Sequence, residues 1–155
     1  MDFIFLADKQ EMKPVVAKWY FDKWGHLNEG ASVASFDNKL NDYLNRDSLP
    51  LMIMAVEDDY ILGVAQLRYH EMSIYPEKEH WLGGVYVDAK HRGKHVASAI
   101  VNKIEQIALT LGVSEIHLQT ESLNGGLYAR LGWQPVEQVN YHGVDVQVMS
   151  KIITA

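Results

Sequence analysis

The chain alternates between segments in which apolar residues recur every three or four positions and segments in which they are continuous or recur every second position. The first spacing is typical of an amphipathic helix and the second of a strand. Helices are therefore expected at 10–24, 31–44, 96–111 and, shorter, around 127–131. Strands are expected at 3–5, 51–56, 61–69, 80–87, 115–120, 134–141 and 144–152.

This order, β-α-α-β-β-β-α-β-α-β-β, predicts an α/β (α+β) fold with one mixed sheet. The strand at 80–87, the long helix and the strand at 115–120 form a right-handed parallel crossover. The short breaks at 57–60 and 142–143 join antiparallel hairpins. Where neighbouring strands diverge, a cleft opens at their carboxyl ends, and we expect the ligand there.

The composition is that of one compact domain over residues 1–155, with 48% hydrophobic and 22% charged residues. The absence of cysteine excludes disulfide scaffolds, iron–sulfur clusters and thiol nucleophiles, and it suits a reducing cytoplasm. The longest apolar run, 49–56, is far shorter than the roughly 18 residues of a membrane span. No basic, apolar export signal opens the sequence. We expect a cytoplasmic protein without membrane association.

Charge and histidine spacing narrow the classes of partner. The formal net charge of −6 disfavours nucleic acid and favours a cationic partner or substrate. The histidines lack HExxH or any other paired metal-ligand spacing, so no metal site is expected.

The most informative segment is the basic turn at 88–98, where a strand becomes a helix. The first-turn N–H groups of a helix have no internal partners and can wrap a phosphate. Gly93 allows close approach, and Arg92 and Lys94 add positive charge. Neither GxxxxGK[ST] nor GxGxxG is present, so the turn is not a P-loop or a dinucleotide fingerprint. The alternative is a basic turn that only caps a surface helix.

This turn resembles the pyrophosphate-binding turn of the GNAT superfamily, the acetyl-CoA-dependent N-acetyltransferases. The family pattern is Arg or Gln, two residues, Gly, one residue, then Gly or Ala, and Arg92-Gly93-Lys94-His95-Val96-Ala97 fills it. His95 stands where the family usually has glycine, and Ala89 replaces a usual proline. We expect His95 to adopt a helical φ and to present its backbone N–H to the pyrophosphate.

A second motif, Leu127-Tyr128-Ala129-Arg130-Leu131-Gly132-Trp133, looks like the family's [FY]-Y-x-[RK]-x-G-[FYW]. In the family this tyrosine lies near the cofactor sulfur and is the general acid for the leaving thiolate, which assigns that role to Tyr128. The alternative is a half-buried aromatic residue on an amphipathic helix. The family's frequent asparagine, several residues earlier, has its nearest counterpart in Asn124.

The resemblance covers roughly 51–151 and implies a GNAT-like fold with two splayed central strands. It implies acetyl-CoA as cofactor and direct attack by a primary amine of a small molecule or peptide, in a ternary complex. Backbone N–H groups at 85–87 are expected to polarise the thioester carbonyl. The residues expected to bind coenzyme A are Val85, Tyr86, Val87, Arg92, Gly93, Lys94, His95, Val96, Ala97, Ser98 and Asn124.

Candidates for the general base are Glu79 and His80, at the mouth of the strand at 80–87, with Glu71 and Glu121 behind them. The acceptor pocket of the fold is walled by the first two helices and the loop before the central strand. The residues expected to line it here are Trp19, Trp24, Met72 and Tyr75, with Tyr20 and His26. Such a wall suits an aromatic or cationic group, whereas the alternative for the same aromatic residues is plain core.

Two other functions remain open. A non-catalytic acyl-CoA-binding or regulatory domain of the same fold would explain His95 in the glycine position and the lack of an obvious base. A plain interaction domain without cofactor would require both motifs to be accidental. Polyamine, aminoglycoside, amino acid and protein N-terminus all remain as acceptors, and so does a homodimer, since dimerisation through the late strands is common in the superfamily.

Overall fold

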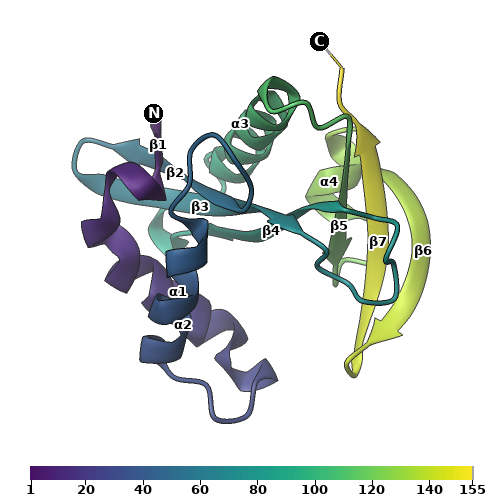
Figure 1. Ribbon diagram of the computed structural model, residues 1–155, viewed down its shortest axis with the longest axis horizontal. Helices are drawn as coiled ribbons and strands as arrows, with labels where there is room; N and C mark the ends of the chain where they lie inside the picture. The colour runs from purple at the N-terminus through teal and green to yellow at the C-terminus, as the bar shows by residue number, and fades with distance from the viewer. Residues whose placement is uncertain (155) are drawn as a thin grey trace.

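The computed structural model describes residues 1–154, and its centre is a seven-stranded sheet (Figure 1). The strands run in the order β1-β2-β3-β4-β5-β7-β6. Their bounds are β1 Asp2–Phe5, β2 Leu51–Glu57, β3 Tyr60–Tyr69, β4 His80–Val87, β5 Glu115–Thr120, β6 Gln134–Tyr141 and β7 Val144–Ile152. The α-helices are α1 Lys13–Trp24, α2 Val33–Lys39, α3 Val96–Thr110 and α4 Gly126–Arg130.

The sheet is mixed, as the element order predicts, and it is nearly divided in the middle. All neighbouring strands pair antiparallel except β4 and β5, which run parallel and share one bridge, Trp81 with His117. Beyond that bridge the two strands diverge toward their carboxyl ends. The predicted mixed sheet with splayed central strands is therefore confirmed.

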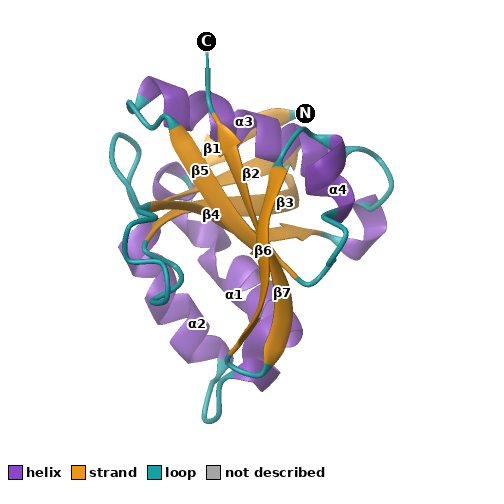
Figure 2. Ribbon diagram, turned by 90° about the vertical axis from the view of Figure 1, so that its right-hand side faces the viewer, coloured by secondary structure: helices purple, strands orange, loops and turns teal. Residues whose placement is uncertain are grey.

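The helices cover both faces of the sheet (Figures 1 and 2). α1 and α2 lie on one face, where Val16, Tyr20 and Leu40 pack against Met52, Met54 and Val64 of the strands. α3 and α4 lie on the other, and the apolar stripe of α3 packs onto β2, β3 and β4. The β6–β7 hairpin projects from the sheet on the α1–α2 side. As a result, α1 and α2 wall one side of a space and the β6–β7 hairpin walls the other.

The first two helices are shorter than their apolar spacing predicts. The predicted helix at 10–24 opens as a 3₁₀ turn, Gln10–Met12, and becomes α-helical at Lys13. The predicted helix at 31–44 begins at Val33, because Ser32 and Ser35 form a capping box, and it changes to a 3₁₀ turn at Leu40–Tyr43. A 3₁₀ turn keeps one side toward the core, so apolar spacing does not separate it from an α-helix.

No helix within residues 1–154 is long and apolar enough to cross a membrane. No three His, Cys, Asp or Glu side chains in this range converge as a metal-binding group.

Candidate functional site

The divergence of β4 and β5 opens a cavity of about 550 Å³ between the carboxyl end of β4, the start of α3 and the start of α4. From β4 it is lined by Val85, Tyr86 and Val87, and from α3 and the turn before it by Ala97 and Arg92. The far wall is formed by Thr120, Ser122, Gly125, Leu127 and Tyr128, and the α1 side by Asp22 and Lys23. This is the cleft that the strand order predicts.

The basic turn at the start of α3 has the form of an anion site. The first-turn N–H groups of this fifteen-residue helix lack intrahelical acceptors and carry the positive end of its dipole. Arg92 donates from Nε to the carbonyl oxygen of Val87 at 3.1 Å, and its guanidinium lies 5.5 Å from the Tyr86 ring centre. A Cβ built on Gly93 has no atom within 4 Å. The turn is open and fits a pyrophosphate.

His95 has a different conformation from the one expected. Its φ is 62° and its ψ 21°, so it is the left-handed N-cap of α3 and not a residue of the first helical turn. A left-handed conformation carries no steric penalty for glycine but costs other residues roughly 1–2 kcal/mol. The backbone shape explains why glycine suits this position. The His95 side chain is exposed and does not line the cavity, while its carbonyl accepts from Oγ of Ser98 at 3.0 Å.

A β-bulge shapes the wall of the cavity along β4. Val64 pairs with Tyr86 and Gln66 with Gly83, so two residues of β4, Gly84 and Val85, face one residue of β3. Gly84 has a φ of +59°, and its carbonyl accepts from Oη of Tyr20 on α1 at 2.6 Å. A bulge takes backbone groups out of the ladder and turns the strand. Val85 is thereby left at the mouth of the cleft.

Tyr128 lies on the opposite wall. Its ring is half-buried and packs edge-on to Trp133 with ring centres 6.2 Å apart. Burial, with a smaller contribution from the charge of Glu71, raises the pKa of the Tyr128 phenol to about 12. Within residues 1–154 its hydroxyl makes no hydrogen bond. A protonated phenol facing a cleft is a proton donor that is ready for a ligand.

A second cavity, of about 880 Å³, opens on the α1–α2 side of the same strands. Its walls are α1 and α2 on one side and the β6–β7 hairpin on the other, with Trp24, Phe36, Tyr43 and Tyr141 among the aromatic residues. Both cavities are lined by Lys23, Val85, Thr120, Ser122 and Tyr128. The two spaces therefore meet at the splay, with Tyr128 at the junction.

The floor of the second cavity is a polar network inside an otherwise apolar sheet. Arg68 on β3 donates from Nε to Gln66 Oε1 at 2.7 Å and from Nη1 to Glu71 Oε1. The other oxygen of Glu71 accepts from Nε2 of Gln119 at 3.2 Å. The side chains of Arg68 and Glu71 are 26% and 12% exposed, so the ion pair is largely removed from water.

Burial and the ion pair together set the charge states on this floor. Burial opposes the charge of Arg68, but Glu71 beside it raises the pKa of the guanidinium above its ordinary value. Burial also raises the pKa of the Tyr20 and Tyr43 phenols, against the opposing effect of Arg68. Beside Glu71, the floor therefore presents a guanidinium and two neutral hydroxyl groups at neutral pH.

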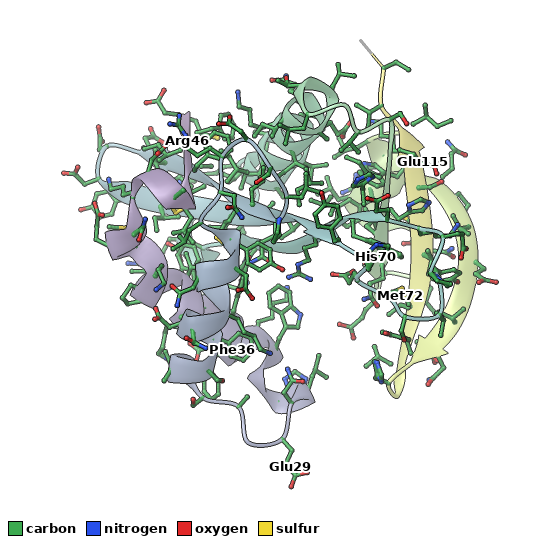
Figure 3. All side chains as sticks on the ribbon, in the orientation of Figure 1. Glu29, Phe36, Arg46, His70, Met72 and Glu115 are labelled. Atoms are coloured by element: carbon green, nitrogen blue, oxygen red, sulfur yellow. The ribbon has the colours of Figure 1, made fainter. Side chains whose placement is uncertain are left out.

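The predicted acceptor wall is assembled only in part. Trp24 lines the second cavity, as does Tyr20. Trp19 does not: it stacks on Tyr86 with ring centres 5.2 Å apart and supports β4 from the α1 side. Met72 and Tyr75 pack with Trp81, Val146 and Val148 in a core cluster behind the β6–β7 hairpin. Figure 3 shows Met72 on that side and Phe36 on the helical side. Trp19, Met72 and Tyr75 are therefore packing residues, as the core alternative describes.

Glu79 and His80 lie away from both cavities. They come before the bridge between Trp81 and His117, at the closed end of the splay, and line neither space. Nε2 of His80 is 3.6 Å from Oε1 of Glu79, and the Glu79 side chain is 55% exposed. Glu71 and Glu121, the two carboxylates placed behind them, do line the second cavity.

The other predicted cofactor residues lie around the first cavity in different ways. Lys94 and Gly93 are exposed on the turn, while the Val96 side chain is buried in the core and contributes only backbone to the turn. Asn124 lines neither cavity; its Oδ1 accepts from the Gly126 N–H at 3.0 Å and shapes the entry to α4.

Sequence reasoning missed Arg68 and Gln66, although a signal was available. These residues occupy alternate positions of a strand that is apolar elsewhere, so both point to the same face as Val64. Polar side chains at period two in a buried strand indicate a polar site on that face. Lys39, Tyr43 and Tyr141 carried no comparable signal, because only the packing of α2 and the hairpin brings them to the cavity.

The model of the acetyltransferase (GNAT) family matches residues 13–133, which is more than half of the chain. No curated protein sequence matches the chain significantly. Solved structures match in fold over almost their whole length. The ribosomal-protein-alanine N-acetyltransferase from Brucella melitensis is 17% identical, with a TM-score of 0.80 and coverage of 98% of this chain and 99% of that one.

Two further solved structures hold the cofactor of the family. An aminoglycoside 6'-N-acetyltransferase complexed with coenzyme A is 16% identical, with a TM-score of 0.79, over 100% of this chain and 98% of that one. The structure of yncA from Salmonella typhimurium, with its cofactor acetyl-CoA, is 20% identical, with a TM-score of 0.78, over 99% of this chain and 94% of that one. At these identities the likeness shows a common fold.

Proposed function

Because the chain belongs to the acetyltransferase (GNAT) family, we propose that it transfers the acetyl group of acetyl-CoA to a primary amine by direct attack in a ternary complex. The observation that carries this proposal is the junction of the two cavities. The first contains the anion turn that suits the cofactor's pyrophosphate, and the second is open to an acceptor. Val85 and Tyr128 line both, so a thioester and an amine held in the two spaces meet between them.

Residues of the first cavity are assigned to the cofactor. The N–H groups at the start of α3 and the guanidinium of Arg92 would hold the pyrophosphate, and the backbone of β4 at Val85–Val87 would bind the rest of the cofactor. Bound acetyl-CoA would supply an activated acetyl thioester as the acyl donor, and coenzyme A would leave as the thiolate. The bulge at Gly84 frees backbone N–H groups near Val85 to stabilise the developing oxyanion.

Tyr128 is assigned as the general acid. The leaving thiolate needs a proton, and the Tyr128 phenol, with its pKa raised to about 12, keeps its proton at neutral pH. Its hydroxyl has no protein partner within residues 1–154 to compete with the sulfur. A phenol that is neutral and unpaired before the reaction gives its proton only where negative charge develops.

Glu71 is assigned as the residue that orients the acceptor amine, in place of Glu79 and His80. Its carboxylate is the more buried of the two acidic side chains that line the second cavity, the other being Glu121. Both oxygens already accept from fixed donors, Arg68 and Gln119, so Glu71 is poorly placed to take a proton outright. The remaining lone pairs accept from the amine, whose proton leaves through water in the open cavity.

The first test of the proposal is a thermal-melt titration with acetyl-CoA, with coenzyme A and ATP as controls. A ligand at 100 times its dissociation constant adds about 2.7 kcal/mol of stability. We expect a saturable rise in melting temperature with acetyl-CoA and coenzyme A that ATP does not produce. Arg92→Gln is expected to weaken acetyl-CoA binding roughly tenfold, since it removes one charged contact. Arg46→Gln, which changes an exposed arginine that lines neither cavity, serves as the matched control. No saturable rise with acetyl-CoA would contradict the proposal.

A further inference from the structure

The second cavity differs in charge from the molecule that contains it. The chain carries a formal net charge of −6. The charged side chains that line this cavity are the cationic Lys23, Lys39 and Arg68 and the acidic Glu71 and Glu121. An acceptor that enters the cavity therefore meets one more positive than negative charge.

The most buried of these acidic groups, Glu71, is already neutralised within the protein. It forms an ion pair with Arg68, and Gln119 donates to its second oxygen. Gly83 makes room for the pair: a Cβ built there would lie 2.6 Å from Nη1 of Arg68 and 2.7 Å from Oε1 of Glu71. The ion pair is thus part of the floor, and Glu71 presents no unbalanced negative charge to a ligand.

The two lysines at the rim have no such partner. Within residues 1–154, neither Lys23 nor Lys39 lies within 4.0 Å of a carboxylate oxygen. Their ammonium groups lie over aromatic rings instead, Lys23 5.2 Å from the ring centre of Trp24 and Lys39 5.6 Å from that of Phe36. Cations held over rings keep their charge available to an anion in the cavity.

We propose that the acceptor carries a carboxylate as well as its amine, as an amino acid or a short peptide does; this rests on the proposed function and names its substrate class. Glu71 orients the amine, and Arg68 or the rim lysines receive the carboxylate through charged hydrogen bonds. The rings of Trp24, Phe36 and Tyr141 contact an apolar body. A polycation has no unpaired buried carboxylate to bind and meets two unpaired lysines, so polyamines and aminoglycosides are poor acceptors.

Matched pairs of acceptors test this class directly. Each pair is an amino acid and its decarboxylated amine: phenylalanine and phenethylamine, tyrosine and tyramine, histidine and histamine. Dipeptides of the same residues form a second arm that distinguishes a peptide from a free amino acid. Spermidine and kanamycin represent polycations. Acetyl transfer is followed as acetyl-CoA-dependent thiol release, confirmed by the mass of the product.

We expect at least one carboxylated acceptor to have a kcat/KM at least tenfold above that of its decarboxylated partner and above both polycations. Lys39→Gln is expected to lower kcat/KM for that acceptor roughly tenfold through KM, while the value for the decarboxylated partner and the Kd of acetyl-CoA stay unchanged. Lys9→Gln, a partly exposed lysine that lines neither cavity, is the control and should change neither.

The outcomes separate this inference from the proposed function. Faster transfer to a decarboxylated amine or a polycation overturns the carboxylate class and leaves the acetyltransferase standing. Acetyl-CoA binding without transfer to any carboxylated acceptor likewise overturns the class. Failure of acetyl-CoA to bind overturns the proposed function itself. An equal effect of Lys39→Gln on both members of a pair would show that the lysine does not contact the carboxylate.

Discussion

Tyr128 and His95 are the two residues on which the proposed function depends most. Tyr128 lies on a cavity wall and His95 lies in the basic turn, and both belong to the family motifs. The local geometry of each suits its role. Tyr128 presents a hydroxyl that makes no protein hydrogen bond in residues 1–154. His95 holds a left-handed conformation at the N-cap of the helix that forms the anion turn.

Tyr128→Phe is expected to lower kcat for acetyl transfer by roughly 10²–10⁴, the usual contribution of a general acid. The Kd of acetyl-CoA should stay within a factor of about two, because the ring and its packing on Trp133 remain. Isothermal titration and steady-state rates measure the two quantities on the same protein. A kcat within a few-fold of wild type would remove Tyr128 from the mechanism.

His95→Gly is expected to raise the free energy of unfolding by about 0.5–1 kcal/mol. Glycine removes the left-handed strain, but it also loses more backbone entropy on folding, which offsets part of the gain. Acetyl-CoA binding should be retained, since the His95 side chain is exposed and does not line the cavity. Asp58→Gly, at another left-handed position in the β2–β3 turn, is the control for strain relief remote from the cofactor. Urea unfolding checks the prediction, and a loss of stability in His95→Gly would contradict it.

Among the elements of the fold, the bulge in β4 contributes most to the site. Gly84 has a positive φ, its carbonyl is held by Tyr20, and the residue after it, Val85, faces both cavities. The bulge thus contacts α1 through Gly84 and lines both the cofactor cavity and the acceptor cavity through Val85.

Gly84→Ala is expected to destabilise the protein more than Gly30→Ala does. Both positions have positive φ, so both variants cost about 1 kcal/mol in backbone strain. A Cβ built on Gly84 also lies 2.5 Å from Oη of Tyr20, whereas a Cβ built on Gly30 has no atom within 4 Å. The extra contact should add about 1–3 kcal/mol and lower acetyl transfer, measured by urea unfolding and thiol release. Equal losses of stability in the two variants would mean that the bulge tolerates a side chain.

The strands and the long helix could be predicted from the sequence almost residue by residue, because apolar period and turn residues are local signals. β5, β6 and β7 have the predicted bounds, and α3 ends one residue before the predicted end. The anion turn and Tyr128 were found for the same reason: each is a short motif. The acceptor cavity was not, since it is made by α1, α2, β3 and the β6–β7 hairpin, and Lys39 and Tyr141 come to line it only after folding.

Across the whole molecule, the backbones of the two halves of the sheet share one bridge within residues 1–154, between Trp81 and His117. His117 is 4% exposed, its ring lies 5.5 Å from that of Trp81, and its Nδ1 has no hydrogen-bond partner. Burial, followed by the charge of Lys78, lowers the pKa of His117 below its ordinary value. A neutral imidazole therefore belongs to the folded state.

The sign of the resulting pH dependence follows from that lowered pKa. The unfolded chain takes up a proton near pH 6.5, before the folded protein does, so stability from His117 is present above that pH and is lost as the pH falls through the folded pKa. Urea unfolding at pH 7.5 and pH 5 should show a larger loss of stability in wild type than in His117→Gln. The exposed His26 provides the control, His26→Gln, which should behave as wild type. The same pH dependence in all three proteins would contradict this role of His117.

The proposed function requires a bound thioester and an amine to meet at the junction of the two cavities. It is tested most directly by free-thiol release from acetyl-CoA, measured on one sample of wild-type protein with and without a panel of amino acids, peptides, diamines and aminoglycosides. We predict release that requires an amine and yields an acetylated product, with the protein's own mass unchanged after acetyl-CoA alone. Saturable acetyl-CoA binding without amine-dependent release would contradict the proposed function and identify an acyl-CoA-binding domain of the same fold.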